Sequence, residues 1–176
     1  WGRVLNLACG DKVLSPLRCQ LIADLECFDD LHGAHLMDVK FSVAIHTLVM
    51  ISESEKALSS QALATSVGTN ASYIRKIISL LKTAGLVSSH QGRSGYQLTK
   101  SPEEITLLEI YYAAQAVDHI SLFQLHQNAN EECPVGKHIN EATTPIFAKI
   151  EKHLEEKLAC QTLGQIINNL YQKSKT

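Results

Sequence analysis

The chain has 176 residues, of which 45% are hydrophobic and 19% are charged, and its net charge is −2 at pH 7. This composition is typical of a globular protein and excludes disordered and fibrous ones. No apolar run approaches the ~18 residues that cross a bilayer, and no basic start precedes an apolar stretch, so we expect a cytoplasmic protein that does not enter a membrane.

The first 36 residues differ in pattern from the remainder of the chain. A short amphipathic helix near residues 14–28 is predicted by apolar residues at helical spacing: Leu17, Leu21, Leu25 and Phe28. Clean periodicity begins only at Met37. We therefore interpret residues 1–36 as a leader or an artificial upstream extension.

The next segment predicts three helices in succession. The first spans residues 38–52 and places Phe41, Ile45 and Leu48 on one face. Ser59 is a good N-cap for a second helix over residues 60–67, because its hydroxyl can accept a hydrogen bond from an exposed main-chain N–H. A tight turn at Gly68-Thr69-Asn70 follows, and it leads into a third helix over residues 71–83.

The third helix is predicted to have two unlike faces. One face is apolar and carries Ile74, Ile77, Ile78 and Leu81, and Gly85 is expected to end the helix in a left-handed conformation. The other face is polar and basic, with no acid: Asn70, Ser72, Tyr73, Arg75, Lys76, Ser79 and Lys82. Two short helices joined by a turn, the second basic on its outer side, predict a helix-turn-helix whose second helix enters the major groove of DNA.

A β-hairpin is predicted directly after this helix. Alternating residues at 86–90 and 96–99 flank a glycine-containing loop, and Arg93 lies at the expected tip. A hairpin in this position is a wing, and an arginine at its tip is suited to the negative potential of the minor groove. Ser101-Pro102-Glu103-Glu104 then predicts the start of another helix.

The C-terminal part is predicted to be helical. The longest helix is expected over residues 145–159, followed by a last helix capped by Thr162. Apolar residues form a stripe along one side of the long helix: Ile146, Ile150, Leu154 and Leu158. A small DNA-binding domain has no room for this much additional apolar helix, so we expect it to contact a second subunit, although a core within one chain is the alternative. This divides the chain into a winged helix-turn-helix domain at 37–102 and a dimerisation and sensor region at 103–176.

Charge is segregated along the chain in a way that favours nucleic acid as a partner. Residues 37–102 contain seven Lys or Arg and three Asp or Glu, whereas residues 103–176 contain six and ten. From Lys56 to Pro102 there are six basic residues and no carboxylate. Because phosphates repel carboxylates, this stretch suits a DNA-facing surface. The residues expected to contact DNA are Ser59, Asn70, Ser72, Tyr73, Arg75, Lys76, His90, Arg93 and Ser94.

The cysteines and histidines predict no metal site. Five cysteines at positions 9, 19, 27, 133 and 160 include no Cys-x-x-Cys pair, and their odd number argues against a disulfide framework. A set of His119, His126, Cys133 and His138 has spacings of seven, seven and five, which match no compact zinc or iron pattern. We expect free thiols.

Five motifs in this order resemble the Rrf2 family of IscR-like bacterial transcription regulators, over about Met37 to Leu170. They are Phe41-Ser42-Val43-Ala44, Ala71-Ser72-Tyr73-Ile74-Arg75-Lys76-Ile77, Leu80-Leu81-Lys82-Thr83-Ala84-Gly85-Leu86-Val87, Gly92-Arg93-Ser94-Gly95-Tyr96-Gln97-Leu98 and Pro102-Glu103-Glu104-Ile105-Thr106-Leu107. The resemblance implies a mostly α fold with a small β-hairpin wing and a long C-terminal dimerisation helix. It also implies a homodimer that binds a pseudo-palindromic operator in double-stranded DNA.

Several members of this family hold an iron-sulfur cluster with three closely spaced cysteines before the long helix. Here only Cys133 lies in that region, so the resemblance is to the cluster-free branch and no cofactor is expected. Cys133-Pro134-Val135-Gly136 resembles a motif of that branch, whose sensors include a thiol or a partner protein. A redox sensor needs a thiolate, and Lys137 or His138 is the neighbour expected to lower the pKa of Cys133.

The sequence thus predicts a sequence-specific transcription regulator, a repressor that acts as a homodimer and responds to oxidation through Cys133. The alternative is a regulatory module whose winged helix binds a protein partner. An enzyme is disfavoured because the sequence has no nucleophile elbow, phosphate loop or paired-carboxylate pattern.

Overall fold

The computed structural model describes residues 39–89 and 95–174. The helix predicted near residues 14–28 lies outside them. So does the hairpin tip, which includes the predicted DNA contacts His90, Arg93 and Ser94.

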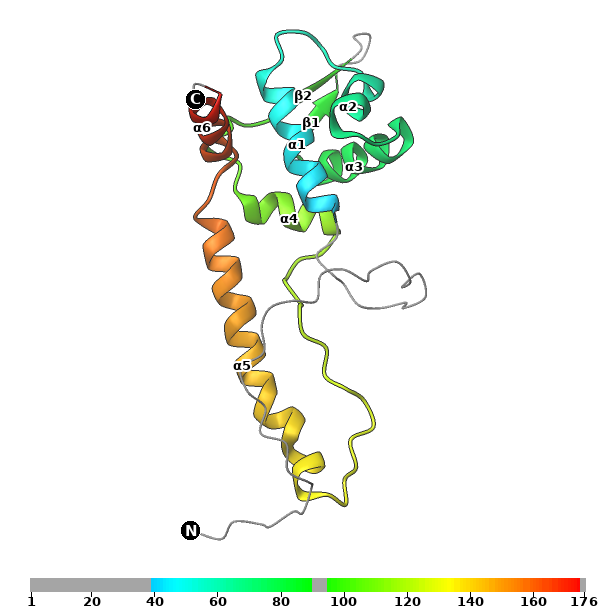
Figure 1. The fold of residues 1–176 in the computed structure, drawn as a ribbon, viewed down its shortest axis with the longest axis vertical. Helices are drawn as coiled ribbons and strands as arrows, with labels where there is room; N and C mark the ends of the chain where they lie inside the picture. The colour runs from blue at the N-terminus through cyan, green and yellow to red at the C-terminus, as the bar shows by residue number, and fades with distance from the viewer. Residues whose placement is uncertain (1–38, 90–94, 175–176) are drawn as a thin grey trace, which may run out of the picture. The chain divides into compact units, whose positions relative to one another are not determined.

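The described residues form helices and one antiparallel hairpin in the order expected of a winged helix-turn-helix (Figure 1). The elements are α1 (Lys40–Glu53), α2 (Ser60–Val67), α3 (Ala71–Thr83), β1 (Val87–Ser89), β2 (Tyr96–Leu98), α4 (Leu107–Gln115), α5 (Pro134–Ala159) and α6 (Leu163–Lys173). The predicted fold class is confirmed. In the described ranges, no helix combines the length and the apolar composition needed to span a membrane.

The α2–turn–α3 unit is defined by its caps. The Ser59 hydroxyl accepts a hydrogen bond from the N–H of Ala62 at 3.2 Å, and Gly68 ends α2 with φ +76°. The side-chain oxygen of Asn70 accepts from the N–H of Tyr73 at 2.8 Å and so caps α3. Each cap satisfies a main-chain group that the helix itself cannot. The predicted bounds of both helices are confirmed.

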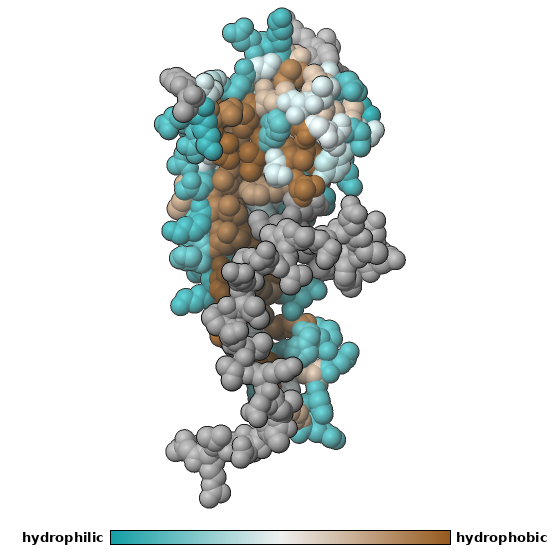
Figure 2. All heavy atoms as spheres, viewed as in Figure 1, coloured by the Kyte–Doolittle hydropathy of each residue, from teal (hydrophilic) through white to brown (hydrophobic). Residues whose placement is uncertain are grey.

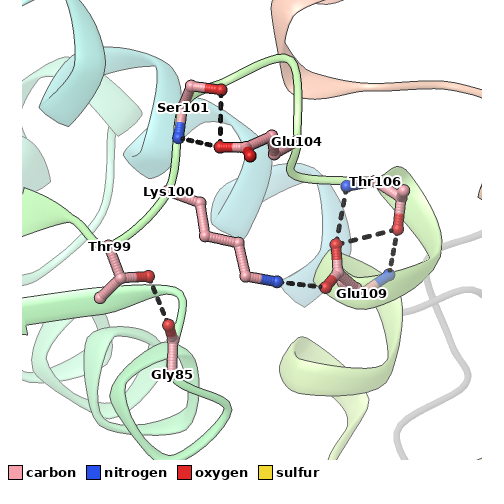
Figure 3. Close-up of polar contacts among 7 residues, drawn as sticks. All are labelled: Gly85, Thr99, Lys100, Ser101, Glu104, Thr106 and Glu109. Carbon is pink, nitrogen blue, oxygen red and sulfur yellow. Dashed lines mark hydrogen bonds and ion pairs between the residues drawn. The ribbon is translucent and has the colours of Figure 1, made fainter.

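The hairpin follows α3 after a left-handed glycine, Gly85, with φ +73°. Strands β1 and β2 pair in the register Val87↔Leu98, Ser88↔Gln97 and Ser89↔Tyr96. The main-chain N–H of Thr99 donates to the carbonyl of Leu86 at 3.2 Å, and the Thr99 hydroxyl donates to the carbonyl of Gly85 (Figure 3). These bonds attach the base of the hairpin to the end of α3.

The helix predicted to start at Ser101 begins later than expected. Ser101 does form a local turn, because its N–H and hydroxyl both donate to the Glu104 carboxylate, at 3.1 and 2.9 Å (Figure 3). Helix α4, however, starts at Leu107, where Thr106 and Glu109 form a capping box. Burial raises the pKa of Glu109, but the hydrogen bonds from Lys100 at 2.7 Å and from Thr106 lower it more, so that it lies below its ordinary value.

The physical reason for this late start is a pairing with a distant segment. The N–H of Leu163 donates to the carbonyl of Ile105 at 2.9 Å, and the N–H of Leu107 donates to the carbonyl of Gln161 at 2.8 Å. Thr106 and Thr162 form an antiparallel bridge. Main-chain groups engaged with residues 161–163 cannot also continue a helix from residue 102.

The long helix begins earlier than predicted. It starts at Pro134 and not at Pro145, which lies inside it. Pro145 has no N–H to donate to the preceding turn. In that turn, the Thr143 hydroxyl donates to the carbonyl of Ile139 at 2.9 Å and the Thr144 hydroxyl to that of Asn140 at 2.7 Å. These side-chain hydrogen bonds add to the bonding of the turn that the proline ring disturbs. The proline therefore removes one main-chain hydrogen bond of the helix without ending it.

One hydrophobic core contains residues from both sides of residue 102, the predicted boundary between the winged helix-turn-helix domain and the C-terminal region. Leu48 of α1, Ile77 of α3, Ile110 of α4 and Leu163 of α6 are all fully buried in the same cluster. Ile167 of α6 is buried there as well. The expectation that the additional apolar helix contacts a second subunit is therefore wrong for Leu163 and Ile167 of the last helix. The pairing at residues 105–107 directs α6 back onto α1 within one chain.

A substitution on α6 tests this shared core. Leu163→Ala should lower the free energy of unfolding by about 2–5 kcal/mol, because it removes a fully buried side chain and leaves a cavity. Leu170→Ala on the same helix is the matched control, since Leu170 is 53% exposed, and it should change the free energy by less than about 0.5 kcal/mol. Denaturant unfolding followed by circular dichroism measures both, and equal effects would place α6 outside the core.

Candidate nucleic-acid interface

Helix α3 presents a basic face to solvent because its apolar face is buried. Ile74, Ile77, Ile78 and Leu81 all lie in the core. The residues opposite them are exposed: Ser72, Arg75, Lys76, Ser79 and Lys82. Tyr73 lies at the boundary, half-buried against the core. The predicted burial of the apolar face is confirmed, and the exposed polar face forms the candidate site.

Arg75 is held in place by hydroxyl groups. One guanidinium nitrogen donates to the Ser72 hydroxyl at 3.0 Å, and the other approaches the hydroxyl of Ser60, the first residue of α2, at 3.4 Å. Both partners are neutral, so they orient the guanidinium without neutralising its charge. Ser60 was not among the predicted contacts, because only the packing of α2 on α3 brings it to this face.

Lys82 connects the far end of α3 to the hairpin. Its ammonium donates to the Ser89 hydroxyl at 2.8 Å. Between α3 and the hairpin is a hollow of about 450 Å³, lined by residues that include Arg75, Ser79, Lys82 and Tyr96. Ser89 and Tyr96 were not among the predicted contacts, and their only sequence signal is their position at the two ends of the wing loop.

The basic face is not neutralised by acids in the described part of the chain. Ion pairs between described residues join Lys100 to Glu109, His119 to Asp118 after the end of α4, and His138 and His153 to acids of α5. None of these pairs involves α3. An uncompensated cationic face is the electrostatic condition for binding a phosphate backbone.

The hairpin is positioned by a close glycine contact. Gly95 has φ +140°, and a Cβ at this position would lie 2.3 Å from the Cβ of Ala57 and 2.8 Å from its Cα. Only glycine fits, because both the conformation and the space exclude a side chain. The start of β2 is thereby seated on the loop between α1 and α2, which fixes the wing next to α3.

Two predicted contacts have a structural task as caps. The hydroxyl of Ser59 caps α2, and the side-chain oxygen of Asn70 caps α3. An asparagine that pairs with adenine uses both its amide oxygen and its amide nitrogen. Because the Asn70 oxygen already accepts from Tyr73, an adenine read by this residue would share that oxygen with the cap.

The predicted dimer residues lie along α5. Ile146 and Ile150 are 58% and 47% exposed, and Leu154 and Leu158 are partly buried. Figure 2 shows hydrophobic residues along this helix. None of the 26 residues of α5 is buried within the chain.

Cys133 is the exposed N-cap residue of α5. Its side chain makes no capping hydrogen bond, but the main-chain N–H groups of Gly136 and then Val135, in the first turn of α5, lower the pKa of the thiol below its ordinary value. The expectation that Lys137 or His138 would cause this shift is wrong. The first turn of a helix points its N–H groups at the capping residue, and these favour the thiolate.

A helix-turn-helix with a basic second helix and an adjoining hairpin defines a winged-helix DNA-binding protein. The chain belongs to the Rrf2 family, whose model, described as an iron-dependent transcriptional regulator, matches residues 37–169. The protein is thus a DNA-binding transcription regulator of that family, as the five sequence motifs indicated.

Relatives agree with this assignment. The chain is 40% identical over 136 residues to YwnA of Bacillus subtilis (strain 168), a provisionally assigned HTH-type transcriptional regulator, covering 77% of this chain and 100% of YwnA. A crystal structure of a provisionally assigned DNA-binding protein is 38% identical, covers 73% of this chain and 98% of its own, and superposes with a TM-score of 0.60. CymR of B. subtilis, at 21% identity, covers 74% of this chain and 94% of its own with a TM-score of 0.57, and it supports the fold.

The described residues do not fit an iron-sulfur cluster. Such clusters need several thiolates that converge on one point. Cys133 precedes the first residue of α5 and Cys160 follows its last, so the two are separated by roughly 40 Å at about 1.5 Å per residue. Within residues 39–89 and 95–174, no group of three or more His, Cys, Asp or Glu side chains is placed to hold a metal ion. The cysteines at positions 9, 19 and 27 lie outside these residues.

The hollow between α3 and the hairpin yields a prediction for Lys82. Lys82→Ala should weaken binding to all DNA sequences alike, and should reduce the slope of log affinity against log salt by about one, because one phosphate contact is lost. Fluorescence anisotropy at several salt concentrations measures this. Lys149→Ala, which removes an exposed lysine from α5, should leave the slope unchanged, and an unchanged slope in Lys82→Ala would exclude Lys82 from the interface.

Proposed function

We propose that the chain is a sequence-specific repressor that binds its operator as a homodimer. The observation that carries this proposal is the exposed face of α3, where Arg75, Lys76 and Lys82 adjoin a hairpin and have no acidic partner among residues 39–89 and 95–174. A helix of this kind fits the major groove, in which arginine and lysine reach guanine edges and phosphates. The hairpin, whose tip is predicted from the sequence to carry Arg93, is then proposed to follow the minor groove.

Dimerisation through α5 is part of the proposal. A helix of 26 residues without a single buried residue adds nothing to the buried core of its own chain. Ile146 and Ile150 leave an apolar strip in water, and a second copy of the same helix would cover it. Two chains joined in this way present two copies of α3, which suits an operator with two-fold symmetry.

Selection from a random pool of double-stranded DNA tests the proposed function. The wild-type protein should enrich an inverted repeat whose half-sites lie about one helical turn apart. The double variant Arg75→Ala/Lys76→Ala should bind the operator more weakly, by about 1–3 kcal/mol of binding free energy for each base contact that is lost. It should also enrich a less defined sequence. Light scattering should find the same dimer in both proteins, since neither residue lies on α5.

Two results would contradict the proposal. An enriched sequence without internal symmetry would argue against a dimer bound to paired half-sites. A folded, dimeric wild type that enriches no sequence would favour the alternative in which the winged helix binds a protein partner.

Cys133 is proposed as a thiol that controls this binding. Its thiolate is favoured by two main-chain N–H groups, and its side chain is exposed. Hydrogen peroxide oxidises a thiolate to sulfenic acid: a new S–O bond forms, the O–O bond breaks, and hydroxide leaves. The neutral product no longer gains from the helix N-terminus as the thiolate does. Oxidation therefore alters the start of α5, the helix proposed to join the subunits.

Oxidant sensitivity should depend on this one residue. Peroxide should release DNA from the wild type and not from Cys133→Ser. Cys160→Ser is the matched control, because Cys160 is also exposed and lies at the opposite end of α5, and it should behave as wild type. Gel-shift titration with peroxide measures the release, and equal release from wild type and Cys133→Ser would remove Cys133 from the proposed mechanism.

A further inference from the structure

Two carboxylates of α5 hold the extended segment that follows α4. One oxygen of Glu155 accepts hydrogen bonds from the Tyr112 hydroxyl at 2.9 Å and from the N–H of Ile120 at 2.8 Å. One oxygen of Glu151 accepts from the N–H groups of Leu122 and Phe123 at 2.7 and 3.1 Å. We refer to these four bonds as the carboxylate clamp. Bonds of this kind to an ionised acceptor are stronger than neutral ones.

The clamp is reinforced by apolar contacts. Ile120 is 2% exposed, and the ring of Phe123 stacks on that of Phe147, one turn before Glu151, with centroids 4.5 Å apart and planes 22° apart. Phe147, Glu151 and Glu155 recur every four residues and so share one face of α5. This face contacts the chain's own segment, whereas Ile146 and Ile150 belong to the neighbouring face.

Helix α5 depends on the clamp for its direction. It contributes no buried residue to the core. Its C-terminal end is fixed, because Thr162 pairs with Thr106 and α6 packs on α1. A rod fixed at one end can still tilt, and the clamp supplies the second point that determines its direction.

The clamp also connects α5 to the recognition helix. Tyr112 belongs to α4, and its neighbours Ile110, Ala113 and Ala114 are buried in the core that includes Ile77 and Leu81 of α3. Helices α3 and α4 are therefore one packed unit. A change in the angle between α4 and α5 becomes a change in the angle between α3 and α5.

We propose that Glu151 and Glu155 are positioning residues that set the distance between the two recognition helices, and so determine which half-site spacing the dimer accepts. This inference rests on the proposed dimeric binding of DNA. If α5 joins the subunits, its angle to α3 decides how far apart the two copies of α3 lie. A tilt of about 10° displaces a point ~34 Å away by about 6 Å, which is nearly two base-pair steps of ~3.4 Å.

The test compares variants that remove the clamp with variants that remove equal charge elsewhere on α5. Glu151→Ala/Glu155→Ala removes all four bonds. The matched control is Glu141→Ala/Glu156→Ala, because both of these acids are exposed and each faces only an exposed histidine, at 3.4 and 3.6 Å. Glu151→Gln/Glu155→Gln keeps one carbonyl oxygen per side chain, and each clamp carboxylate uses only one oxygen.

Binding is measured on the operator selected by the wild type, on the same operator with one or two base pairs added or removed, and on a single half-site. For the alanine clamp variant we expect an unchanged dimer, half-site affinity within about twofold of wild type, and about tenfold weaker binding to the native spacing. Its preference among spacings should be flattened. The glutamine variant and the control should keep the wild-type preference.

Three results would overturn the inference. The alanine variant could show the same spacing preference as the control. It could be monomeric or unfolded, which would give the clamp a merely structural role. The glutamine variant could lose the preference as fully as the alanine variant, which would make charge and not the hydrogen bonds responsible. Failure of the proposed function is recognised separately, because the wild type itself would then select no symmetric operator.

Discussion

Burial of one face of α3 is the constraint on which the remaining structure depends. Ile77 and Leu81 can leave water only if the helix lies against α1 and α4, and this orientation leaves Arg75, Lys76 and Lys82 outside. The hydrophobic effect thus orients α3, and the 3.6-residue period of the helix places the charged side chains on the opposite, exposed face. Hydroxyl groups complete the arrangement, since Ser60, Ser72 and Ser89 hold two of the cations without cancelling their charge.

The parts of the fold that depend on local signals could be predicted from the sequence. Ser59, Gly68 and Asn70 each act within one helical turn of their own position, so the bounds of α2 and α3 follow from residue type alone. The wing is specified in the same local way by alternating residues around a glycine loop. The family motifs span these same elements, which explains why they pointed to the correct fold.

Two of the features that the sequence could not predict, the start of α4 and the roles of Glu151 and Glu155, depend on contacts between distant residues. Ile105 pairs with Leu163, and this contact moves the start of α4 beyond the local turn at Ser101. A proline suits the first turn of a helix and is also tolerated inside a long one, so Pro145 alone could not locate the start of α5. Glu151 and Glu155 resemble any acids on a solvated helix, because main-chain N–H groups 28 to 35 residues away carry no signature in the sequence.

The return of α6 to the core also has a consequence for folding during synthesis. Leu163 and Ile167 complete a cluster whose other members begin at Ala44, so the ends of the described fold are packed together. A ribosome delivers these residues in order, and the helix-turn-helix emerges long before its last packing partners. The nascent chain must therefore carry an unfinished apolar surface until α6 is released, and a protein shortened before residue 163 would keep that surface exposed.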